Sequence, residues 1–527
     1  MNSQAGTLDL TDCDKEPIHI PGSIQPHGLL VVLKADTLRV TQMAGDTENL
    51  LGKEMAELLG KPVEAVVGAE LRDALVSLEA DSPEPLYVGS LHLPGRQVTS
   101  LDVTRHYRKG LLILELEPSA TSNLSATEAI GHIRRILVSW EEAGTLQELY
   151  DASCKSLRIL TGFDRVMIYR FLEDDTGVVI AEHKADDLDA LVNHHYPASD
   201  IPKQARALYL KNPIRLIADA DYKPAQLFPI VDPVSGSQLD MSECSLRSVS
   251  PIHVQYLKNL NVAASMSISI IVDGRLWGLV SCHHTSARFV PYELRETCRL
   301  LGRILSQMIK ALQDAARSAQ SERLTAARER LLRNLANVDS VENGVAEYLK
   351  DMQQLVQADG AALIRHGKLS QTGSTPSEDQ TRELVQWLLD NTRSPIFATS
   401  SLSNDHEPAK AYSIQASGLL AAVIAHSGPF VLLWFRAEHV ETINWAGNPH
   451  KPIEPGSEPG QLTPRKSFED WKETVRNKAN PWSESEIDCA RLFGRAIHDM
   501  RTQHILTEMN LQLQKTLAVK QALAERK

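Results

Sequence analysis

The stretch Tyr196-Pro197-Ala198-Ser199-Asp200-Ile201-Pro202 is the most informative part of this sequence. On its own, an aspartate before an Ile-Pro pair would predict only a capped turn. Two further motifs lie downstream, Arg247-Ser248-Val249-Ser250-Pro251-Ile252-His253-Val254-Gln255-Tyr256 and Cys282-His283-His284-Thr285-Ser286. Near the N-terminus, Cys13 precedes Ile18-His19-Ile20-Pro21-Gly22-Ser23-Ile24-Gln25-Pro26-His27-Gly28. The meaning of each motif depends on the other three.

The composition is that of a large globular protein. A chain of 527 residues exceeds one hydrophobic core and suggests three or four domains. Its 43% hydrophobic and 23% charged residues are ordinary, and a net charge of -12 gives no reason to expect nucleic acid as a partner. The six scattered cysteines fit neither a disulfide framework nor a CxxC metal pair, so reduced thiols in a cytoplasmic protein are expected.

No segment predicts a signal peptide or a membrane helix. Met1 to Asp12 lack a basic region and an apolar region. The most apolar stretch, Leu419 to Phe435, is interrupted by His426-Ser427-Gly428-Pro429, and two short strands around a turn explain it better than a membrane span.

The first domain is expected over residues 28–120, behind an N-terminal arm of residues 1–27. Apolar runs at Leu29 to Leu33 and Gly110 to Leu116 bracket helical material, which predicts a small α+β domain. The small polar residues Ser119 to Asn123 mark its end.

A second domain is expected over residues 125–310. It opens with a helical pattern, and its clearest strands are Val262 to Val272 and Arg275 to His284. Asp273-Gly274 joins these strands and is a strong hairpin signal.

A third domain, residues 325–505, repeats this plan. Leu419 to Ala425 and Phe430 to Arg436 predict a second hairpin. A helix is expected from Ser483, since Ser483 and Glu486 have the spacing of a capping box.

Two long helices are expected, a connecting helix over residues 292–337 and a C-terminal output helix over residues 483–527. Each carries an apolar stripe: Leu301, Leu305, Met308, Leu312, Ala315 and Ala319, then Leu324, Leu331 and Leu335, on the first, and Ile505, Met509, Leu513 and Leu517 on the second. The stripes fit either packing onto the protein's own domains or a parallel homodimer. The dimer is favoured, because both helices outlast what one domain could cover.

Residues 440–479 depart from core patterning. They are rich in proline, glycine and charge, with Trp445 and Trp471 within them and Trp482 just beyond. An insertion of this length without a core face is either disordered or functional.

Together the motifs resemble those of bacterial phytochromes (bacteriophytochromes), red/far-red photoreceptors that carry a linear tetrapyrrole. The resemblance covers nearly the whole chain, and the insertion resembles the family's "tongue" through Trp445-Ala446-Gly447-Asn448-Pro449, Pro464-Arg465-Lys466-Ser467-Phe468 and Trp471-Lys472-Glu473. It implies an α+β photosensory core of PAS, GAF and PHY domains. Central antiparallel sheets flanked by helices, long connecting helices and an N-terminal figure-of-eight knot are expected.

The pigment implied by the resemblance is biliverdin, attached as a thioether to Cys13. A lone cysteine in a polar arm is usually incidental, and only its place before the Ile18-to-Gly28 motif changes that interpretation. Plant and many cyanobacterial phytochromes have a cysteine immediately before the histidine that matches His253. Here Ile252 occupies that place and cannot form a thioether, which disfavours phycocyanobilin and phytochromobilin.

A bilin pocket must supply cations and hydroxyls for two propionates, an acceptor for pyrrole N–H groups and stacking surfaces. The resemblance implies that Arg215 and Arg247 bind the propionates and that the backbone carbonyl of Asp200 accepts from the pyrroles. His253 takes part in a proton network and His283 binds the ring D carbonyl. Further contacts are implied for Tyr169, Tyr196 and Tyr256 around ring D, Ile201, and the hydroxyls of Tyr209, Ser250, Ser265 and Ser267.

Two of these expectations can be checked against strand geometry. Ser265 and Ser267 lie two apart on a predicted strand, so both side chains point to one face. The adjacent His283 and His284 point to opposite faces, which makes a zinc chelate a poor interpretation and places only one of them in a pocket. Without the motifs, the tyrosines would be ordinary core residues with polar tips.

The expected function is light sensing. Isomerisation of the C15=C16 bond would alter contacts of Asp200 with the tongue residues Arg465 and Ser467, refold the tongue and signal through the helices. The output module or response regulator would belong to a two-component system, commonly with a histidine kinase. The ground state in darkness stays open.

Two alternatives come from other classes. A GAF-type sensor of a small ligand would leave Cys13 and the tongue without a role. An enzyme is not expected in this chain, since no P-loop, GxSxG or HExxH motif and no kinase ATP-binding region occurs.

Overall fold

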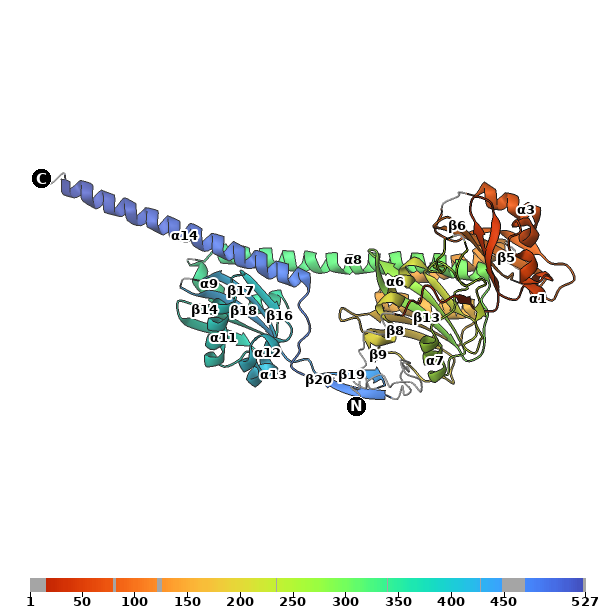
Figure 1. Ribbon diagram of the computed structural model, residues 1–527. Coiled ribbons are helices and arrows are strands. Elements are labelled where there is room, and N and C mark those ends of the chain that lie inside the picture. The colour runs from red at the N-terminus through yellow and green to blue at the C-terminus, as the bar shows by residue number, and fades with distance from the viewer. Residues whose placement is uncertain are drawn as a thin grey trace, which may run out of the picture. The chain divides into compact units, whose positions relative to one another are not determined.

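The computed structural model describes residues 16–78, 82–120, 126–233, 235–338, 340–426, 428–447 and 470–524. Cys13, Arg465 and Ser467 therefore lie outside the described residues. The chain divides into two compact units (Figure 1). The first contains residues 1–312 and 444–472, and the second contains residues 313–443 and 473–527.

The first domain of unit one is a five-stranded antiparallel sheet in the order β3-β2-β6-β5-β4. Its strands are β2 (Leu29–Lys34), β3 (Arg39–Ala44), β4 (Leu86–His92), β5 (Ser100–Arg108) and β6 (Leu111–Pro118). Leu112 and Leu114 of β6 pack in the core with helices α2 (Met55–Leu58) and α3 (Glu64–Ser77). Leu111 and Ile113 point to the other face and pack against Leu239 and Leu246 of the next domain. Because both faces are covered, β6 is apolar on both sides from Leu111 to Leu114.

The second domain is built on an eight-stranded sheet in the order β10-β12-β13-β7-β8-β9-β19-β20. Its strands are β7 (Arg165–Phe171), β8 (Gly177–Lys184), β9 (His194–Tyr196), β10 (Ile214–Ile217), β12 (Ala264–Val272), β13 (Arg275–His284), β19 (Glu441–Ala446) and β20 (Asp470–Val475). Asp273 and Gly274 join β12 to β13 with φ of 51° and 73°, the left-handed conformation that the Asp-Gly hairpin signal predicted. β19 pairs with β9 in parallel, an exception to the expected antiparallel sheet.

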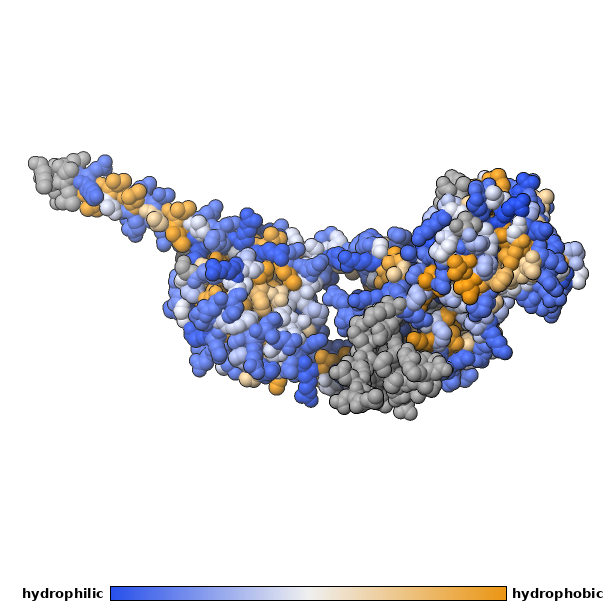
Figure 2. Space-filling model, in the orientation of Figure 1, coloured by the Kyte–Doolittle hydropathy of each residue, from blue (hydrophilic) through white to orange (hydrophobic). Residues whose placement is uncertain are grey.

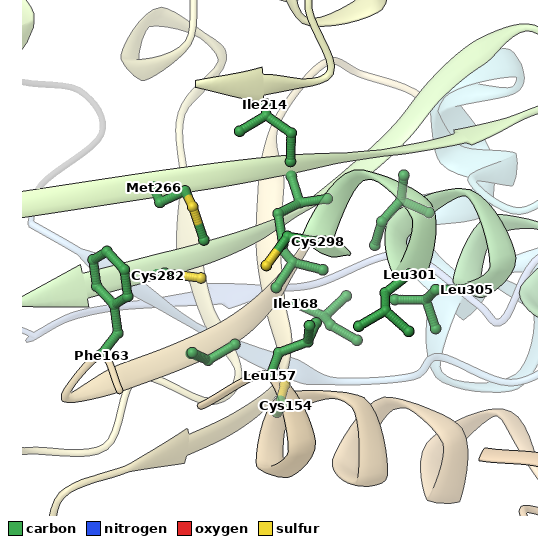
Figure 3. Close-up of a cluster of buried hydrophobic side chains, with 14 of the residues drawn as sticks. Cys154, Leu157, Phe163, Ile168, Ile214, Met266, Cys282, Cys298, Leu301 and Leu305 are labelled. Carbon is green, nitrogen blue, oxygen red and sulfur yellow. The ribbon is translucent and has the colours of Figure 1, made fainter. Parts of the chain in front are cut away.

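Helices α4 (Ala126–Glu141), α5 (Leu146–Thr161) and the first part of α8 (Tyr292–Ala336) cover one face of this sheet. Figure 3 shows their core, in which the thiols of Cys154, Cys282 and Cys298 lie among apolar side chains. Helices α6 (Lys203–Lys211) and α7 (Pro251–Asn259) lie on the opposite side. That side holds the cavity described below.

The segment before β2 is held by the second domain. β1 (Ser23–Ile24) pairs with β11 (Ala225–Gln226). The backbone N–H of Gln25 donates to Leu246 O at 2.8 Å, and its side-chain Nε2 donates to Leu216 O at 2.8 Å. These contacts hold the segment against β10, β11 and Leu246 of the second domain, while the figure-of-eight knot stays a prediction.

Unit two contains a five-stranded sheet in the order β15-β14-β18-β17-β16, antiparallel throughout. Its strands are β14 (Gly360–Arg365), β15 (Lys368–Gly373), β16 (Ile396–Thr399), β17 (Gly418–Ala425) and β18 (Phe430–Arg436). One face packs against the end of α8, α9 (Val341–Glu347), α10 (Leu349–Leu355) and α14 (Glu484–Ala524). The other packs against α11 (Glu378–Asn391), α12 (Leu402–Asp405), the short helix Glu407–Tyr412 and α13 (Ser413–Ala416). The expected α+β architecture is confirmed.

The capping box at the start of α14 is confirmed. Ser483 N donates to Glu486 Oε2 at 2.8 Å, and Glu486 N donates to Ser483 Oγ at 3.3 Å. These bonds satisfy N–H groups that the first turn of a helix leaves without partners.

The apolar stripe of α8 has another role than the one favoured from the sequence. Leu301 and Leu305 are fully buried in the core of the second domain, and Met308 and Leu312 pack against it. Leu331 and Leu335 are buried in the third domain, with Leu324 packed beside them. Packing onto the protein's own domains therefore accounts for these residues, whereas Ala315 and Ala319 of the same stripe are exposed.

The apolar stripe of α14, in contrast, is exposed to solvent. Ile505, Met509, Leu513 and Leu517 are 42–64% exposed, and Figure 2 shows apolar side chains along the free end of this helix. Among the described residues, no helix has the length and hydropathy that crossing a bilayer requires.

Candidate functional site

A cavity of about 240 Å³ lies on the face of the eight-stranded sheet opposite its core. It is bounded by the sheet, α6, α7 and the loops at residues 197–202 and 247–250. All of the predicted pocket residues that the structure describes line it: Tyr169, Tyr196, Asp200, Ile201, Tyr209, Arg215, Arg247, Ser250, His253, Tyr256, Ser265, Ser267 and His283. Residues far apart in the sequence thus meet at one site.

Strand register explains the wall that the sheet contributes. Arg215 of β10 lies opposite Ser267 of β12, and Ser265 lies opposite His283 of β13. Directly paired residues point to the same face, so all four side chains meet the cavity. The residues between them, Met266 and Cys282, point into the core (Figure 3).

Only one histidine of the His283-His284 pair lines the cavity. His283 Nε2 lies 3.2 Å from Ser281 Oγ. Its enclosure by protein, with Arg165 and His253 nearby, lowers the pKa of His283 to about 3. His284 points away and its Nδ1 lies 2.8 Å from Asp164 Oδ2.

Two arginines form the most polar end of the cavity. Arg215 donates to the backbone carbonyls of Ser245, at 3.1 Å, and Arg247. Arg247 Nη1 donates to Ile18 O at 2.9 Å. Within the described part of the chain, Arg247 Nε and Ser248 Oγ are buried without a hydrogen-bond partner. Burial and the charge of Arg215 lower the pKa of Arg247 to about 9. Two enclosed cations, with unused donors on Arg247 and the neighbouring Ser248, suit an anionic ligand.

Helix α7 presents the next group of side chains. Ser250 is its N-cap and accepts from Ile252 N at 3.3 Å, with Pro251 at the first position. Three-residue spacing then places His253 and Tyr256 on the same face of the helix. The His253 ring stacks on Tyr256, with centroids 5.9 Å apart and planes at 11°. Enclosure by protein and then the charge of Arg215 lower the pKa of His253 to about 4, so its imidazole is neutral at pH 7.

Aromatic side chains enclose the far end. Tyr256 Oη donates to Asp200 Oδ2 at 3.0 Å. The ring centroids of Tyr169 and Tyr196 lie 5.7 Å apart, and both side chains pack with Ala446 of β19 in one cluster. The Tyr169 ring lies directly over Gly177, where any Cβ would overlap it, so the glycine of β8 makes room for the tyrosine of β7.

The ends of the tongue insertion that the structure describes are strands. Asn444 and Trp445 of β19 pair with His194 and His195 of β9. The Trp445 and His195 rings lie 5.7 Å apart. The sequence pattern predicted no strand there.

Other lining residues were missed at the sequence level. Ser281 lies two positions before His283, and Arg165 and Met167 alternate with Tyr169 on β7, so strand periodicity could have found all three. Glu16, whose Oε2 accepts from Ser250 Oγ at 2.8 Å, belongs to no periodic pattern.

Comparison with known proteins identifies the domains. Family models match in the order PAS fold (residues 13–119), GAF domain (145–312) and phytochrome region (324–505). Cyanobacterial phytochrome B of a Nostoc species is 38% identical over 518 residues, which cover 97% of this chain and 69% of that protein. A bacteriophytochrome of Pseudomonas aeruginosa is 35% identical over 516 residues, with the same two coverages.

Two solved structures are similar in fold. A bacteriophytochrome from R. palustris superimposes with a TM-score of 0.82 and 37% identity, covering 94% of this chain and 99% of that one. The phytochrome photosensory core module of Stigmatella aurantiaca gives a TM-score of 0.78 and 39% identity, with the same coverages.

Proposed function

Because this chain belongs to the phytochrome family, with its PAS, GAF and PHY domains, we propose that the cavity binds biliverdin and that the protein switches between red- and far-red-absorbing states. The observation that carries the proposal is the enclosed pair Arg215 and Arg247, with an unused donor on Arg247, at one end of an aromatic-walled cavity. A linear tetrapyrrole has the matching chemistry, with two carboxylates at its centre and a long π-system.

The residues present fit this pigment. Arg215, Arg247 and the hydroxyls of Ser265 and Ser267 would hold the propionates. The Asp200 carbonyl would accept from the pyrrole N–H groups, and neutral His283 would donate to the ring D carbonyl. When bound, biliverdin supplies red-light absorption and a C15=C16 double bond that can isomerise. Tyr169, Tyr196 and Tyr256 would constrain that end of the pocket, with Ile201 and the Tyr209 and Ser250 side chains completing its walls.

Ile252 favours biliverdin over other bilins. It occupies the position before His253 where a thioether-forming cysteine would be needed, and it lines the cavity. Cys13 is the proposed attachment site instead.

Signalling would pass from the cavity to the tongue. Asp200 is the proposed partner of Arg465 and Ser467, and refolding of the tongue would be transmitted by the long helices to an output module, such as a histidine kinase in the full-length protein or a response regulator. Strand β19 of the tongue pairs with β9 over two residues, and β9 pairs with β8 over two residues. Strands paired over so few residues can lie within a few kcal/mol of another conformation. Two copies of the chain would associate through the exposed α14 stripe.

Covalent attachment of biliverdin to Cys13 provides a direct test of this function. After incubation with biliverdin, a denaturing gel stained by zinc-induced bilin fluorescence should show a fluorescent band. Cys13→Ser should lose the band yet keep reversible binding, because the arginines remain. A Cys282→Ser control should keep the band, since burial raises the pKa of that thiol well above its usual value. A band that survives Cys13→Ser would show that attachment occurs elsewhere.

A further inference from the structure

The segment that carries Arg247 has no regular secondary structure of its own. Residues 244–250 lie between β11 and α7 and form neither helix nor strand, apart from an isolated bridge between Arg247 and Ile24. Arg215 donates to the carbonyls of Ser245 and Arg247, so both arginines depend on how this segment is held. An irregular loop keeps one conformation only where tertiary contacts impose it.

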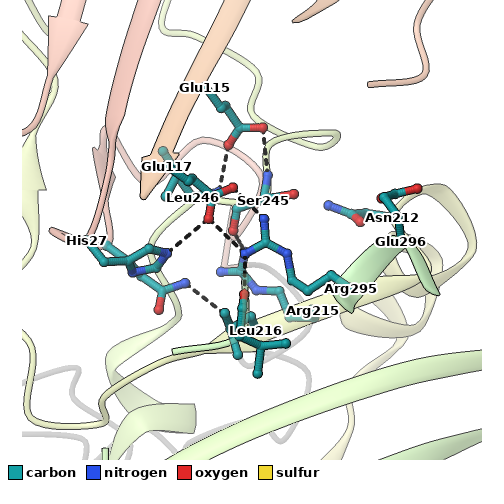
Figure 4. A network of polar contacts seen from close by, with 12 residues as sticks. His27, Glu115, Glu117, Asn212, Arg215, Leu216, Ser245, Leu246, Arg295 and Glu296 are labelled. Atoms are coloured by element: carbon teal, nitrogen blue, oxygen red, sulfur yellow. Dashed lines mark hydrogen bonds and ion pairs between the residues drawn. The ribbon is translucent and has the colours of Figure 1, made fainter. Parts of the chain in front are cut away.

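Two of its N–H groups, those of Ser245 and Leu246, are held by a side chain of the PAS domain. Glu115 Oε1 accepts from Leu246 N at 2.6 Å, and Glu115 Oε2 accepts from Ser245 N at 3.1 Å (Figure 4). Glu115 lies on β6, on the face of Leu111 and Ile113 that packs against this segment, and is 1% exposed. Its two oxygens therefore fix two successive peptide groups immediately before Arg247, with bonds of the charge-assisted kind.

Glu117, two residues further along β6, has different partners. Its carboxylate binds Arg295 of α8, with Nη1 to Oε2 at 2.8 Å, and lies 3.4 Å from His27 Nε2. It is also buried on the same face. The strand thus presents two similar carboxylates, of which only Glu115 contacts the arginine-bearing segment.

We infer that Glu115 is a positioning residue for the carboxylate-binding end of the pocket: through the 245–246 peptides it sets the placement of Arg247 and, with it, of Arg215. The inference rests on the proposed function, since it assigns a task in binding the pigment's propionates. It makes the PAS domain part of the binding site although Glu115 does not line the cavity.

The charges around Glu115 determine how it is tested. Burial and the charge of Glu117 raise the pKa of Glu115 to about 7. The two backbone N–H donors and the charge of Arg295 act in the opposite direction and lower it. Arg215 and Cys244 are the other titratable groups that interact with it. The ionised form accepts both N–H groups, so binding is measured at pH 8.

The test uses the 527-residue chain carrying Cys13→Ser, in which binding is reversible, and compares biliverdin with its dimethyl ester, whose carboxylates are neutralised. Glu115→Gln should weaken biliverdin by about tenfold, as expected for a misplaced charge-assisted partner, and leave the ester unchanged. Glu117→Gln should not change the ratio of the two affinities. In Arg247→Ala protein, Glu115→Gln should change that ratio less than in protein with native Arg247, because only the placement of Arg215 can still change.

The ratio of the affinities for biliverdin and its dimethyl ester separates a positioning role from damage to the fold, because a poorly folded variant binds both ligands more weakly. Glu115→Asp, which keeps the charge, provides a second folded variant and should show a smaller loss of biliverdin than Glu115→Gln. An acid-to-ester ratio unchanged by Glu115→Gln, or changed equally by Glu117→Gln, would overturn the inference. If the Cys13→Ser protein with native Glu115 bound no biliverdin, the proposed function itself would fail.

Discussion

At the scale of single residues, the pocket keeps its histidines neutral. His253 and His283 lie beside Arg215 and Arg165, and enclosure by protein lowers the pKa of each. A neutral imidazole has one donor and one acceptor nitrogen, so His253 can accept a proton from the pigment side and His283 can donate to a carbonyl. The opposite orientations of His283, which lines the cavity, and His284, which pairs with Asp164, follow from strand alternation.

His253→Ala should change the pH at which the pigment loses its proton. His253 is expected to stabilise the protonated pigment, so its removal should lower the pKa of the bound pigment. When the pH is raised, the long-wavelength band of the biliverdin-loaded variant should therefore bleach at a lower pH than that of native protein. The expected shift is about one pH unit, equivalent to one hydrogen bond of about 1.4 kcal/mol. A spectrophotometric titration measures it, with His284→Ala as the control. Identical midpoints for His253→Ala and native protein would remove His253 from the proton network.

At the scale of elements, strands were the most predictable. Both hairpins and the shared face of Ser265 and Ser267 follow from period-two patterning and turn chemistry, which are local properties. The helix α8 was predicted, but the partner of its stripe was not, because a domain core and a dimer seam require nearly the same apolar period. The β9–β19 pairing joins segments far apart in sequence, and Glu16 acts through one side chain, so neither leaves a local pattern.

The tongue provides the element-scale prediction. Asp200 and Arg465 are proposed to pair in one photostate, so Asp200→Ala and Arg465→Ala should each alter dark reversion without preventing pigment attachment. Their effects on the reversion barrier should be non-additive by about 1–3 kcal/mol, as for residues in contact. A double-mutant cycle on reversion rates measures this coupling. Lys466→Ala, the neighbouring cation, should combine additively with Asp200→Ala; additivity for Arg465 as well would mean that the two side chains do not meet.

At the scale of the whole molecule, the exposed stripe of α14 is the proposed contact between two copies. Leu513→Glu places a charge in that stripe and should weaken self-association by about tenfold or more, since an unpaired charge is costly in an apolar interface. Sedimentation equilibrium gives the dissociation constant. Gln512→Glu adds the same charge at the adjacent exposed position and should have little effect. Equal association of Leu513→Glu and native protein would place the interface elsewhere.

The proposed function requires that bound biliverdin convert reversibly between two absorbing states. Absorption spectra of the biliverdin-loaded protein, taken before and after red light and again after far-red light, test it most directly. We expect the pocket to induce an intense red or far-red band, which converts under one colour of light and recovers under the other. A pigment that stays spectrally free, or a bound pigment whose spectrum does not change under either light, would contradict it.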